Sequence, residues 1–370
     1  MRNKKKIVTV VGARPQFVKA AVLSRLIRTN KWKDKFNEVL VNTGQHYDKD
    51  MSDVFFEEME IPKPYYNLNI GSGSHGKMTG EMLIKIEEVL LKEKPDFVLV
   101  YGDTNSTLAA TLAASKMHIK LVHVEAGLRS FWKSMPEEQN RICTDHLSDF
   151  LFSPTETAVY NLKNEGLTKG VFNVGDIMFD AYLYYSQKLG DEREALFEKI
   201  KEINNINLLK KKEYYLLTIH RAENTDNKAK LKNIVDALNK VKTPAIYPAH
   251  PRTIKQLKKF NLKFKPHIHI IEPVGYFEML GLQTFCKFIV TDSGGLQKEA
   301  FFAKKPCITL REQTEWIETV KSGWNKLVGS NCEKIIYQIN NITIDENKII
   351  NYYGNGDTGE KVLKTLAKVN

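Results

Sequence analysis

Long apolar segments and paired cysteines are both missing from this sequence. No apolar run approaches the roughly 20 residues that a membrane-spanning helix needs. The short run "IVTVV" near the start ends before Arg14-Pro15, so it predicts a first buried strand rather than a signal peptide. Four scattered cysteines form no C-x-x-C pair, which favours neither a zinc site nor a disulfide framework: Cys143, Cys286, Cys307 and Cys332. We therefore expect a cytoplasmic protein without metal, cofactor or membrane insertion.

Acidic residues are fewer than basic residues in this chain. The chain has 55 lysines and arginines against 44 aspartates and glutamates, which gives a formal net charge of +11. Such a balance can indicate nucleic-acid binding, but the lysines are spread along exposed-looking helices and short runs such as 4–6 and 210–212, without interleaved aromatic residues. A basic nucleic-acid-binding protein stays a distant alternative. We expect no nucleic-acid partner, and a basic surface that attracts an acidic small molecule.

The length and the apolar pattern indicate two α/β domains. A chain of 370 residues with 42% hydrophobic and 27% charged residues suits two globular domains with a core each. Apolar runs alternate with helical patterns: KIVTVVGA, EVLVNTG, DFVLVYGD, KLVHVEA and DFLFSPT, then YYLLTIH, PAIYPAH, HIHIIEPV, KFIVTDSG and KPCITLRE. This alternation predicts parallel sheets with helices on both faces. The predicted fold is two Rossmann-like doubly wound domains, with a break near 170–185.

Polar residues cluster where the predicted strands end, which is where ligands bind in such sheets. The loops are GARPQ, TGQHYD, YGDTNS and HVEAGLRS in the first half, and TIHRAEN, PAHPRT and TDSGG in the second. Two sheets whose strand ends both carry such loops would face each other across a central cleft.

The segment TDSGG joins a predicted strand, FIV, to a predicted helix, LQKEAFFA. Asp292 and Ser293 are candidates to cap this helix. Gly294 and Gly295 allow close approach to the backbone, and the helix N-terminus offers free N–H groups to an anion such as a phosphate. A tight turn without a ligand is the alternative for an isolated S-G-G.

The ordered set of motifs, from GARPQFVKAA near the start to YGNGDTGEKV near the end, resembles the non-hydrolysing UDP-N-acetylglucosamine 2-epimerases. This resemblance implies the glycosyltransferase-B fold, a UDP-sugar substrate and a homodimer. It also implies that the C-terminal helix returns to the first domain. The expected domains are 1–173 with 354–370, and 174–353, the UDP-binding domain.

The resemblance also implies a set of substrate- and UDP-binding residues: Arg14, Lys19, Arg141, His250, Ser293, Gly294, Gly295, Glu299 and Arg311. In this set the S-G-G turn would bind the diphosphate and Glu299 the ribose hydroxyls. Spacing alone favours a solvated helix residue for Lys19. Arg311 is either an anion partner or a surface ion pair.

The implied chemistry inverts C2 of the sugar by elimination of UDP, through a 2-acetamidoglucal to which UDP adds again. Proton transfer on both faces requires more than one titratable group. The candidate catalytic residues are Asp103, Glu125, Glu137 and His220. Crowded carboxylates are expected to have raised pKa values. Taken alone, Asp103 would be a turn or capping residue and Glu125 a satisfied buried carboxylate. We expect Glu138 to be a structural helix residue and His123 a core histidine.

Several loops depart from the common family pattern: GARPQ, HRAEN and TEWIET. The family's regulatory site uses a pair like Gln45-His46 with a glutamine-bearing loop, where this chain has GSGSHGKMTGE, so the sequence does not predict substrate activation. These departures resemble a subgroup that acts on UDP-2,3-diacetamido-2,3-dideoxyglucuronic acid, for which His75, Lys77 and Arg252 are possible carboxylate donors and Trp316 a possible apolar wall. A glycosyltransferase of the same fold is the alternative enzyme.

Overall fold

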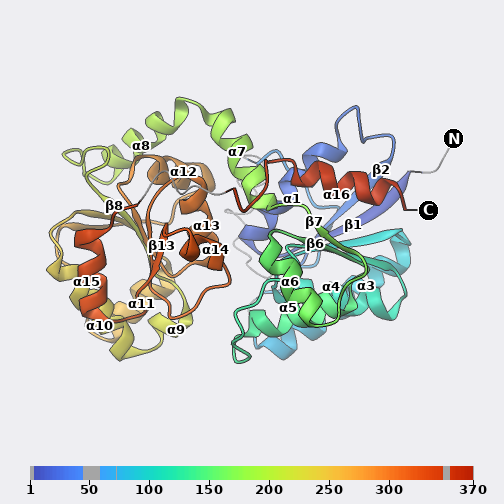
Figure 1. The fold of residues 1–370 in the computed structure, drawn as a ribbon, viewed down its shortest axis with the longest axis horizontal. Helices are drawn as coiled ribbons and strands as arrows, with labels where there is room; N and C mark the ends of the chain where they lie inside the picture. Colours follow the sequence, from blue (N-terminus) through green and yellow to red (C-terminus); the bar gives the residue numbers. More distant parts are fainter. Residues whose placement is uncertain (1–3, 45–58, 72, 345–350, 370) are drawn as a thin grey trace. The chain divides into compact units, whose positions relative to one another are not determined.

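The computed structural model describes residues 4–44, 59–71, 73–344 and 351–369. The chain forms two compact units, Met1–Tyr184 with Asn351–Asn370, and Tyr185–Ile350 (Figure 1). The units change within helix α7 (Ile177–Leu189), whereas the sequence-based boundary at 173/174 precedes that helix. The pair Gln45-His46 lies outside the described residues.

The first unit is built on a parallel sheet with the strand order β3-β2-β1-β4-β5-β6-β7. Its strands are β1 (Lys5–Val11), β2 (Phe36–Asn42), β3 (Tyr66–Asn67), β4 (Phe97–Tyr101), β5 (Lys120–Val124), β6 (Phe150–Ser153) and β7 (Val171–Asn173). Five of them are the predicted runs. β1, β4 and β5 are almost wholly buried apolar segments, as expected for strands covered on both faces.

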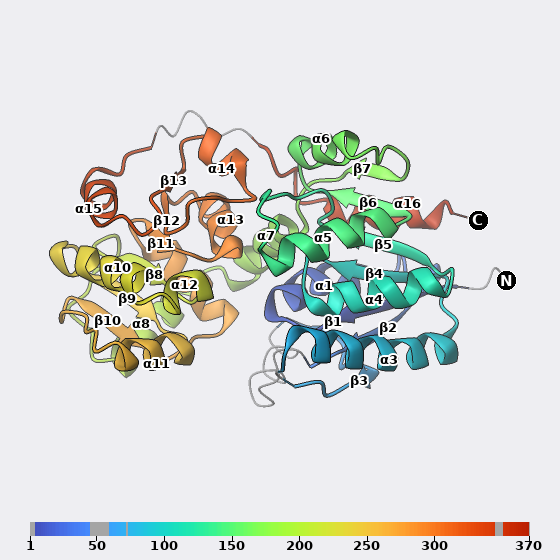
Figure 2. The same ribbon diagram turned by 90° about the horizontal axis from the view of Figure 1, so that it is seen from below.

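Helices cover both faces of this sheet. They are α1 (Arg14–Ile27), α3 (His75–Glu93), α4 (Asn105–Lys116), α5 (Pro136–Leu147), α6 (Glu156–Asn164) and α16 (Thr358–Ala367). Figures 1 and 2 show α3, α4 and α5 on one face, and α1 with the C-terminal α16 on the other. The close fit of α16 depends on Gly359, where a Cβ would stand 2.6 Å from a methyl of Leu26.

The second unit repeats the design with the strand order β10-β9-β8-β11-β12-β13, again with parallel pairings. Its strands are β8 (Tyr215–Thr218), β9 (Ala245–Pro248), β10 (Ile268–Ile271), β11 (Ile289–Thr291), β12 (Cys307–Thr309) and β13 (Asn325–Leu327). Its helices are α8 (Glu192–Ile203), α9 (Ala222–Thr225), α10 (Lys228–Lys240), α11 (Pro251–Lys259), α12 (Tyr276–Phe285), α13 (Gly294–Phe302), α14 (Ile317–Lys321) and α15 (Cys332–Asn341). The predicted α/β class with two doubly wound sheets is confirmed.

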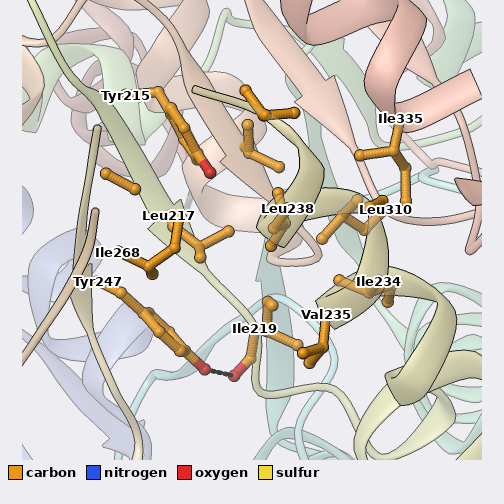
Figure 3. Packing of buried hydrophobic residues seen from close by; sticks show 14 of the residues in the cluster. Tyr215, Leu217, Ile219, Ile234, Val235, Leu238, Tyr247, Ile268, Leu310 and Ile335 are labelled. Atoms are coloured by element: carbon orange, nitrogen blue, oxygen red, sulfur yellow. Dashed lines mark hydrogen bonds between the residues drawn. The ribbon is translucent and has the colours of Figure 1, made fainter. Parts of the chain in front are cut away.

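The core of the second unit packs α10 and α15 against the sheet (Figure 3). Tyr247 is fully buried, and its hydroxyl donates a hydrogen bond of 2.8 Å to the carbonyl of Ile219. Burying a phenol without such a partner would be costly, so this bond fixes the strand end just before His220. In the described part of the chain, no helix combines the length and apolarity that a bilayer crossing requires.

Candidate functional site

In the first unit, the candidate residues lie where β4 and β5 end. Tyr101 pairs with Val124 at the ends of these neighbouring parallel strands. The residues that follow, Asp103 and Glu125, therefore leave the sheet at the same edge. The N–H of Gly102 donates to the carbonyl of Val124 at 3.1 Å and holds the two loops together.

Lys19 and Glu125 form a buried ion pair. Lys19 is only 8% exposed, so the solvated alternative for this residue is wrong: α1 packs its side chain inward against the end of β5. Gly102 fits against the pair, because a Cβ there would stand 3.1 Å from Glu125 Oε2 and 3.2 Å from Lys19 Nζ. Its φ of +61° is also one that glycine adopts without strain.

Glu125 itself has a left-handed backbone, with φ of +77°. This conformation costs a non-glycine residue about 1–3 kcal/mol, and it persists only where the surroundings hold it. Here the N–H groups of Glu125 and Ala126 both donate to the carbonyl of Phe152 on β6. The backbone therefore turns the carboxylate inward toward Lys19.

Arg141, on the first turns of α5, joins two carboxylates. Its guanidinium pairs with Asp103 and with Glu138, the latter at 2.8 Å. Glu138 is buried and also accepts hydrogen bonds from the N–H groups of Ser130 and Phe131, so it is a structural residue that holds the loop before α5. Arg141 thereby holds the Asp103 carboxylate against α5, where Glu138 fixes the guanidinium.

Glu137 and Arg14 lie at helix beginnings in the same unit. Glu137 is partly exposed in the first turn of α5, where a negative charge is favourable. Arg14 is partly buried at the first position of α1, directly after the loop that follows β1. Asp103 is also partly exposed, whereas Glu125 is buried.

In the second unit, a buried aspartate organises the loop that carries His220. Asp292, which directly follows β11, accepts hydrogen bonds from the N–H groups of His220 and Arg221 and from the amide of Asn224. The Nδ1 of His220 lies 3.7 Å from Asp292 Oδ1, and the ring is exposed. The sequence indicated Asp292 only as a cap, but Ser293 caps α13.

The two glycines of the S-G-G turn have different surroundings. A Cβ on Gly294 would stand 2.4 Å from Glu315 Oε1, so protein packing alone explains that glycine. A Cβ on Gly295 would meet no atom within 4 Å, and the φ of Gly295 is not left-handed. Neither packing nor backbone conformation therefore requires a glycine at 295, and the space beside it is open.

Glu299 and Arg311 are both buried and both have a partner. Glu299 accepts a hydrogen bond of 2.7 Å from Gln283 Nε2. Arg311 donates to Glu315 at 3.0 Å and is 4% exposed, so this is a buried ion pair rather than a surface one. His250 is exposed at the N-cap of α11, where its Nδ1 accepts from the N–H of Arg252.

The possible substrate donors are differently placed. His75, at the start of α3, contacts the side-chain amide of Asn105. The side-chain amide of Asn140 donates to Asn105 Oδ1 and to the backbone carbonyl of Asp103. His75 is thus linked to the Asp103 loop through two amides.

Lys77 and Arg252 instead form exposed pairs with Glu81 and Asp226. Trp316 is buried beneath the ammonium of Lys298, 3.9 Å from its ring centre, which supports packing rather than a substrate wall.

The sequence reasoning missed three buried acidic residues that hold loops or glycines: Asp145, Asp292 and Glu315. No spacing rule reveals Glu315, because residues 311–315 lie outside any helix and a pair four positions apart there need not face each other. The others pair over long separations, which spacing does not show. Among the residues that the structure describes, no three His, Cys, Asp or Glu side chains gather as a metal ion would require.

Two parallel-sheet domains with charged groups at their strand ends define an α/β enzyme with a glycosyltransferase-B-like fold, the fold of its structural relatives. The sequence model of the UDP-N-acetylglucosamine 2-epimerase family matches residues 28–367, and the chain belongs to this family. The predicted family and enzyme class, a UDP-sugar 2-epimerase and hence an isomerase, are confirmed.

The relatives match the chain along nearly its whole length. A UDP-N-acetylglucosamine 2-epimerase homolog of Methanococcus maripaludis is 55% identical, over 98% of this chain and 99% of the relative. The UDP-2,3-diacetamido-2,3-dideoxy-D-glucuronate 2-epimerase of Pseudomonas aeruginosa is 47% identical, over 98% and 100%. The solved structure of Methanocaldococcus jannaschii UDP-GlcNAc 2-epimerase, in complex with UDP-GlcNAc and UDP, has a TM-score of 0.89 at 46% identity and covers 98% of this chain and 100% of that one.

Proposed function

We propose that this enzyme inverts C2 of a UDP-N-acetylhexosamine for surface polysaccharide precursors. A base removes the C2 proton while the C1–O bond breaks, and the bonding electrons leave with UDP. The resulting 2-acetamidoglucal is protonated at C2 from the other face, and UDP adds again at C1. The observation that carries this proposal is the charged cluster at the ends of β4 and β5, in which Lys19 pairs with Glu125 and Arg141 with Asp103.

The exposure of the carboxylates suggests their roles. A group that exchanges its proton with water must be reached by water, and Asp103 and Glu137 are partly exposed. Glu125 is buried beside Lys19. We therefore assign proton transfer at C2 to Asp103 and Glu137, and assign Glu125 with Lys19 to the charge balance around the departing diphosphate.

The second unit supplies the groups suited to UDP. The N-terminus of α13 offers backbone N–H groups and open space at Gly295 to the diphosphate, beside Ser293 and Gly294. Glu299, oriented by Gln283, suits the paired ribose hydroxyls. The guanidinium of Arg311, which is held by its hydrogen bond to Glu315, adds positive charge in the same unit. His220, with its loop fixed by Asp292, can act on the leaving phosphate oxygen. Arg14 and His250 are the further binding residues.

Turnover in heavy water tests the chemistry. We expect deuterium at C2 of the product, because the proton that returns to C2 comes from a group in exchange with solvent. Asp103→Asn and Glu137→Gln should each lower kcat by about a hundredfold. Glu156→Gln is the matched control, since Glu156 is also in the first turn of a helix and is exposed. Product without solvent deuterium would instead indicate hydride transfer or a proton shielded from solvent.

We propose that UDP-2,3-diacetamido-glucuronate is processed better than UDP-N-acetylglucosamine. The Pseudomonas aeruginosa relative and the UDP-N-acetylglucosamine 2-epimerase of Methanocaldococcus jannaschii are each 47% identical to this chain, so this comparison does not decide between the two substrates. His75 is the candidate carboxylate donor, because it connects to the Asp103 loop while Lys77 and Arg252 pair elsewhere. A dedicated partner should favour the acidic sugar by about a thousandfold in kcat/KM. A clear preference for UDP-N-acetylglucosamine on the same preparation would refute this choice.

The glycosyltransferase alternative makes a different prediction. A transferase needs an acceptor, so epimer formation from UDP-sugar alone would exclude it. We also propose a cytoplasmic homodimer, which light scattering of the purified protein would test by its mass.

A further inference from the structure

A chain of four buried or partly buried charged groups lies behind the Asp103 loop. His123 on β5 contacts the carbonyl of Gly102 through Nε2 at 2.8 Å and Asp145 Oδ1 through Nδ1 at 2.7 Å. Asp145 Oδ2 contacts Arg129 at 2.7 Å, and Arg129 forms two bonds of 2.7 Å with Glu165. His123, Asp145 and Arg129 are all less than 5% exposed. Groups of alternating charge therefore run from the surface to Gly102.

The hydrogen bonds define the protons on His123. A backbone carbonyl can only accept, so Nε2 must donate to Gly102. Asp145 Oδ2 accepts from the N–H of Gly127 and from the guanidinium of Arg129, which favours the ionised carboxylate. An ionised carboxylate also can only accept, so Nδ1 must donate as well. His123 with protons on both nitrogens is an imidazolium.

The pKa of Asp145 agrees with this arrangement. Burial by itself would raise it, but the hydrogen bonds and charges of His123 and Arg129 lower the pKa below its ordinary value. The charged groups that face the pair come from α5, the β5–α5 loop and the C-cap of α6: Asp145, Arg129 and Glu165, with His146 in contact with Glu165. An imidazolium balances the two carboxylates together with Arg129.

The carbonyl that His123 binds belongs to the residue before Asp103. Gly102 has a left-handed φ and no side chain, so its peptide is easily turned unless something holds it. The carbonyl of Asp103 is held by Asn140 at 2.9 Å, and its carboxylate by Arg141. A charge-assisted hydrogen bond from His123, which lies in strand β5, holds the carbonyl of Gly102 on the side of the sheet.

We propose that His123, as an imidazolium paired with Asp145, is a positioning residue that fixes the Gly102–Asp103 peptide and thereby aims the Asp103 carboxylate at the sugar. His123 touches no reacting atom and acts through Gly102. The proposal rests on the role of Asp103 in the proposed function. A merely structural core histidine would be neutral, and its bond to Gly102 would not affect turnover selectively.

The first test is the protonation of His123 in the intact enzyme. Side-chain ¹⁵N spectra of the protein labelled at its 9 histidines should show one ring with both nitrogens protonated, as the two hydrogen bonds of His123 require. In Asp145→Asn, the same ring is expected to lose the Nδ1 proton, which also assigns the signal. A wild-type His123 with an unprotonated Nδ1 would overturn the proposal.

The second test exchanges the charged pair for a neutral one. In His123→Gln, an amide N–H can replace the bond to Gly102, but the amide oxygen then faces the Asp145 carboxylate. We expect kcat to fall about ten- to hundredfold with KM unchanged, since Asp103 is misplaced but binding is kept. In His123→Gln/Asp145→Asn, the amides are complementary, and kcat should rise at least about tenfold above the single variant.

Asp149→Asn is the control, because Asp149 accepts a hydrogen bond from Leu121 at the opposite end of β5. It should leave kcat unchanged. A double variant no more active than His123→Gln would overturn the positioning role. If instead Asp103→Asn keeps full activity, the role of Asp103 in the proposed function fails and the positioning role fails with it, while the spectra still decide the protonation of His123. Where the single variant does not fold, the wild-type spectra and the double variant carry the test.

Discussion

Replacing Gly295 by alanine should weaken UDP binding without destabilising the protein. The new Cβ would meet no protein atom within 4 Å, and the φ of Gly295 is not left-handed. Alanine is a better helix residue than glycine, so we expect the free energy of unfolding to stay equal or rise by up to about 1 kcal/mol. The methyl group would stand where the diphosphate approaches the α13 N-terminus. We expect UDP to bind at least about tenfold more weakly, a loss of about 1.4 kcal/mol.

Two further alanine variants separate binding from stability. Gly80 in α3 also has no atom within 4 Å of its virtual Cβ, so Gly80→Ala should match the stability of Gly295→Ala and bind UDP normally. Gly294→Ala places a Cβ 2.4 Å from Glu315 Oε1 and should lower the free energy of unfolding by about 1–3 kcal/mol. Titration calorimetry with UDP and urea denaturation measure both quantities. Normal UDP affinity in Gly295→Ala would refute the assignment of the diphosphate to this turn.

Variants at three other positions, Glu125, Asp180 and Lys19, test the energetics of the first unit by urea denaturation. Glu125→Gly should be more stable than Glu125→Ala by about 1 kcal/mol, because Glu125 has a φ of +77°. Burial raises the pKa of Asp180 from 3.8 to about 6. The folded state therefore binds this proton more tightly, and the free energy of unfolding should fall by up to about 3 kcal/mol as pH rises from about 4 to about 6. Asp180→Asn should flatten that slope. Lys19→Met should cost about 3–5 kcal/mol by leaving Glu125 buried without its cation, and Lys19→Met/Glu125→Gln should recover most of the loss.

Each of these three predictions would be contradicted by a specific measurement. Equal stability of the two Glu125 variants would show that the left-handed backbone stores no strain. A slope that persists in Asp180→Asn would assign the pH dependence to other groups. No recovery in the double variant of Lys19 and Glu125 would mean that Lys19 stabilises the fold through its packing rather than its charge.

The sequence predicted the central strands and missed three at the edges of the sheets. β3, β7 and β13 have only two or three residues each, and they lie at the ends of the strand orders. A central strand is covered on both faces and needs a continuous apolar run, which the sequence displays. A short edge strand is defined by the backbone groups of its neighbour, β2, β6 or β12, and these leave no periodic signature.

Burial of single polar residues could not be predicted in the same way. Spacing alone favoured a solvated Lys19, because its partner Glu125 is 106 positions away and nothing in the local spacing joins them. Arg311 has its partner four residues on, yet the sequence does not show that both side chains are buried. Lysine and arginine are buried only when paired, so their burial depends on contacts that the fold creates.

The acidic residues at the strand ends show how structure divides groups that look alike in sequence. Loops at strand ends have backbone N–H groups that no strand or helix satisfies, and buried carboxylates bind them: Asp145 binds Gly127, Glu138 binds Ser130 and Phe131, and Asp292 binds His220 and Arg221. An oxygen that accepts two or more fixed donors is stabilised as an anion and is poorly suited to taking a proton. Asp103 and Glu137 reach solvent, as proton transfer requires. Solvent access therefore separates the buried carboxylates that hold the loops from the partly exposed ones proposed to act on the sugar.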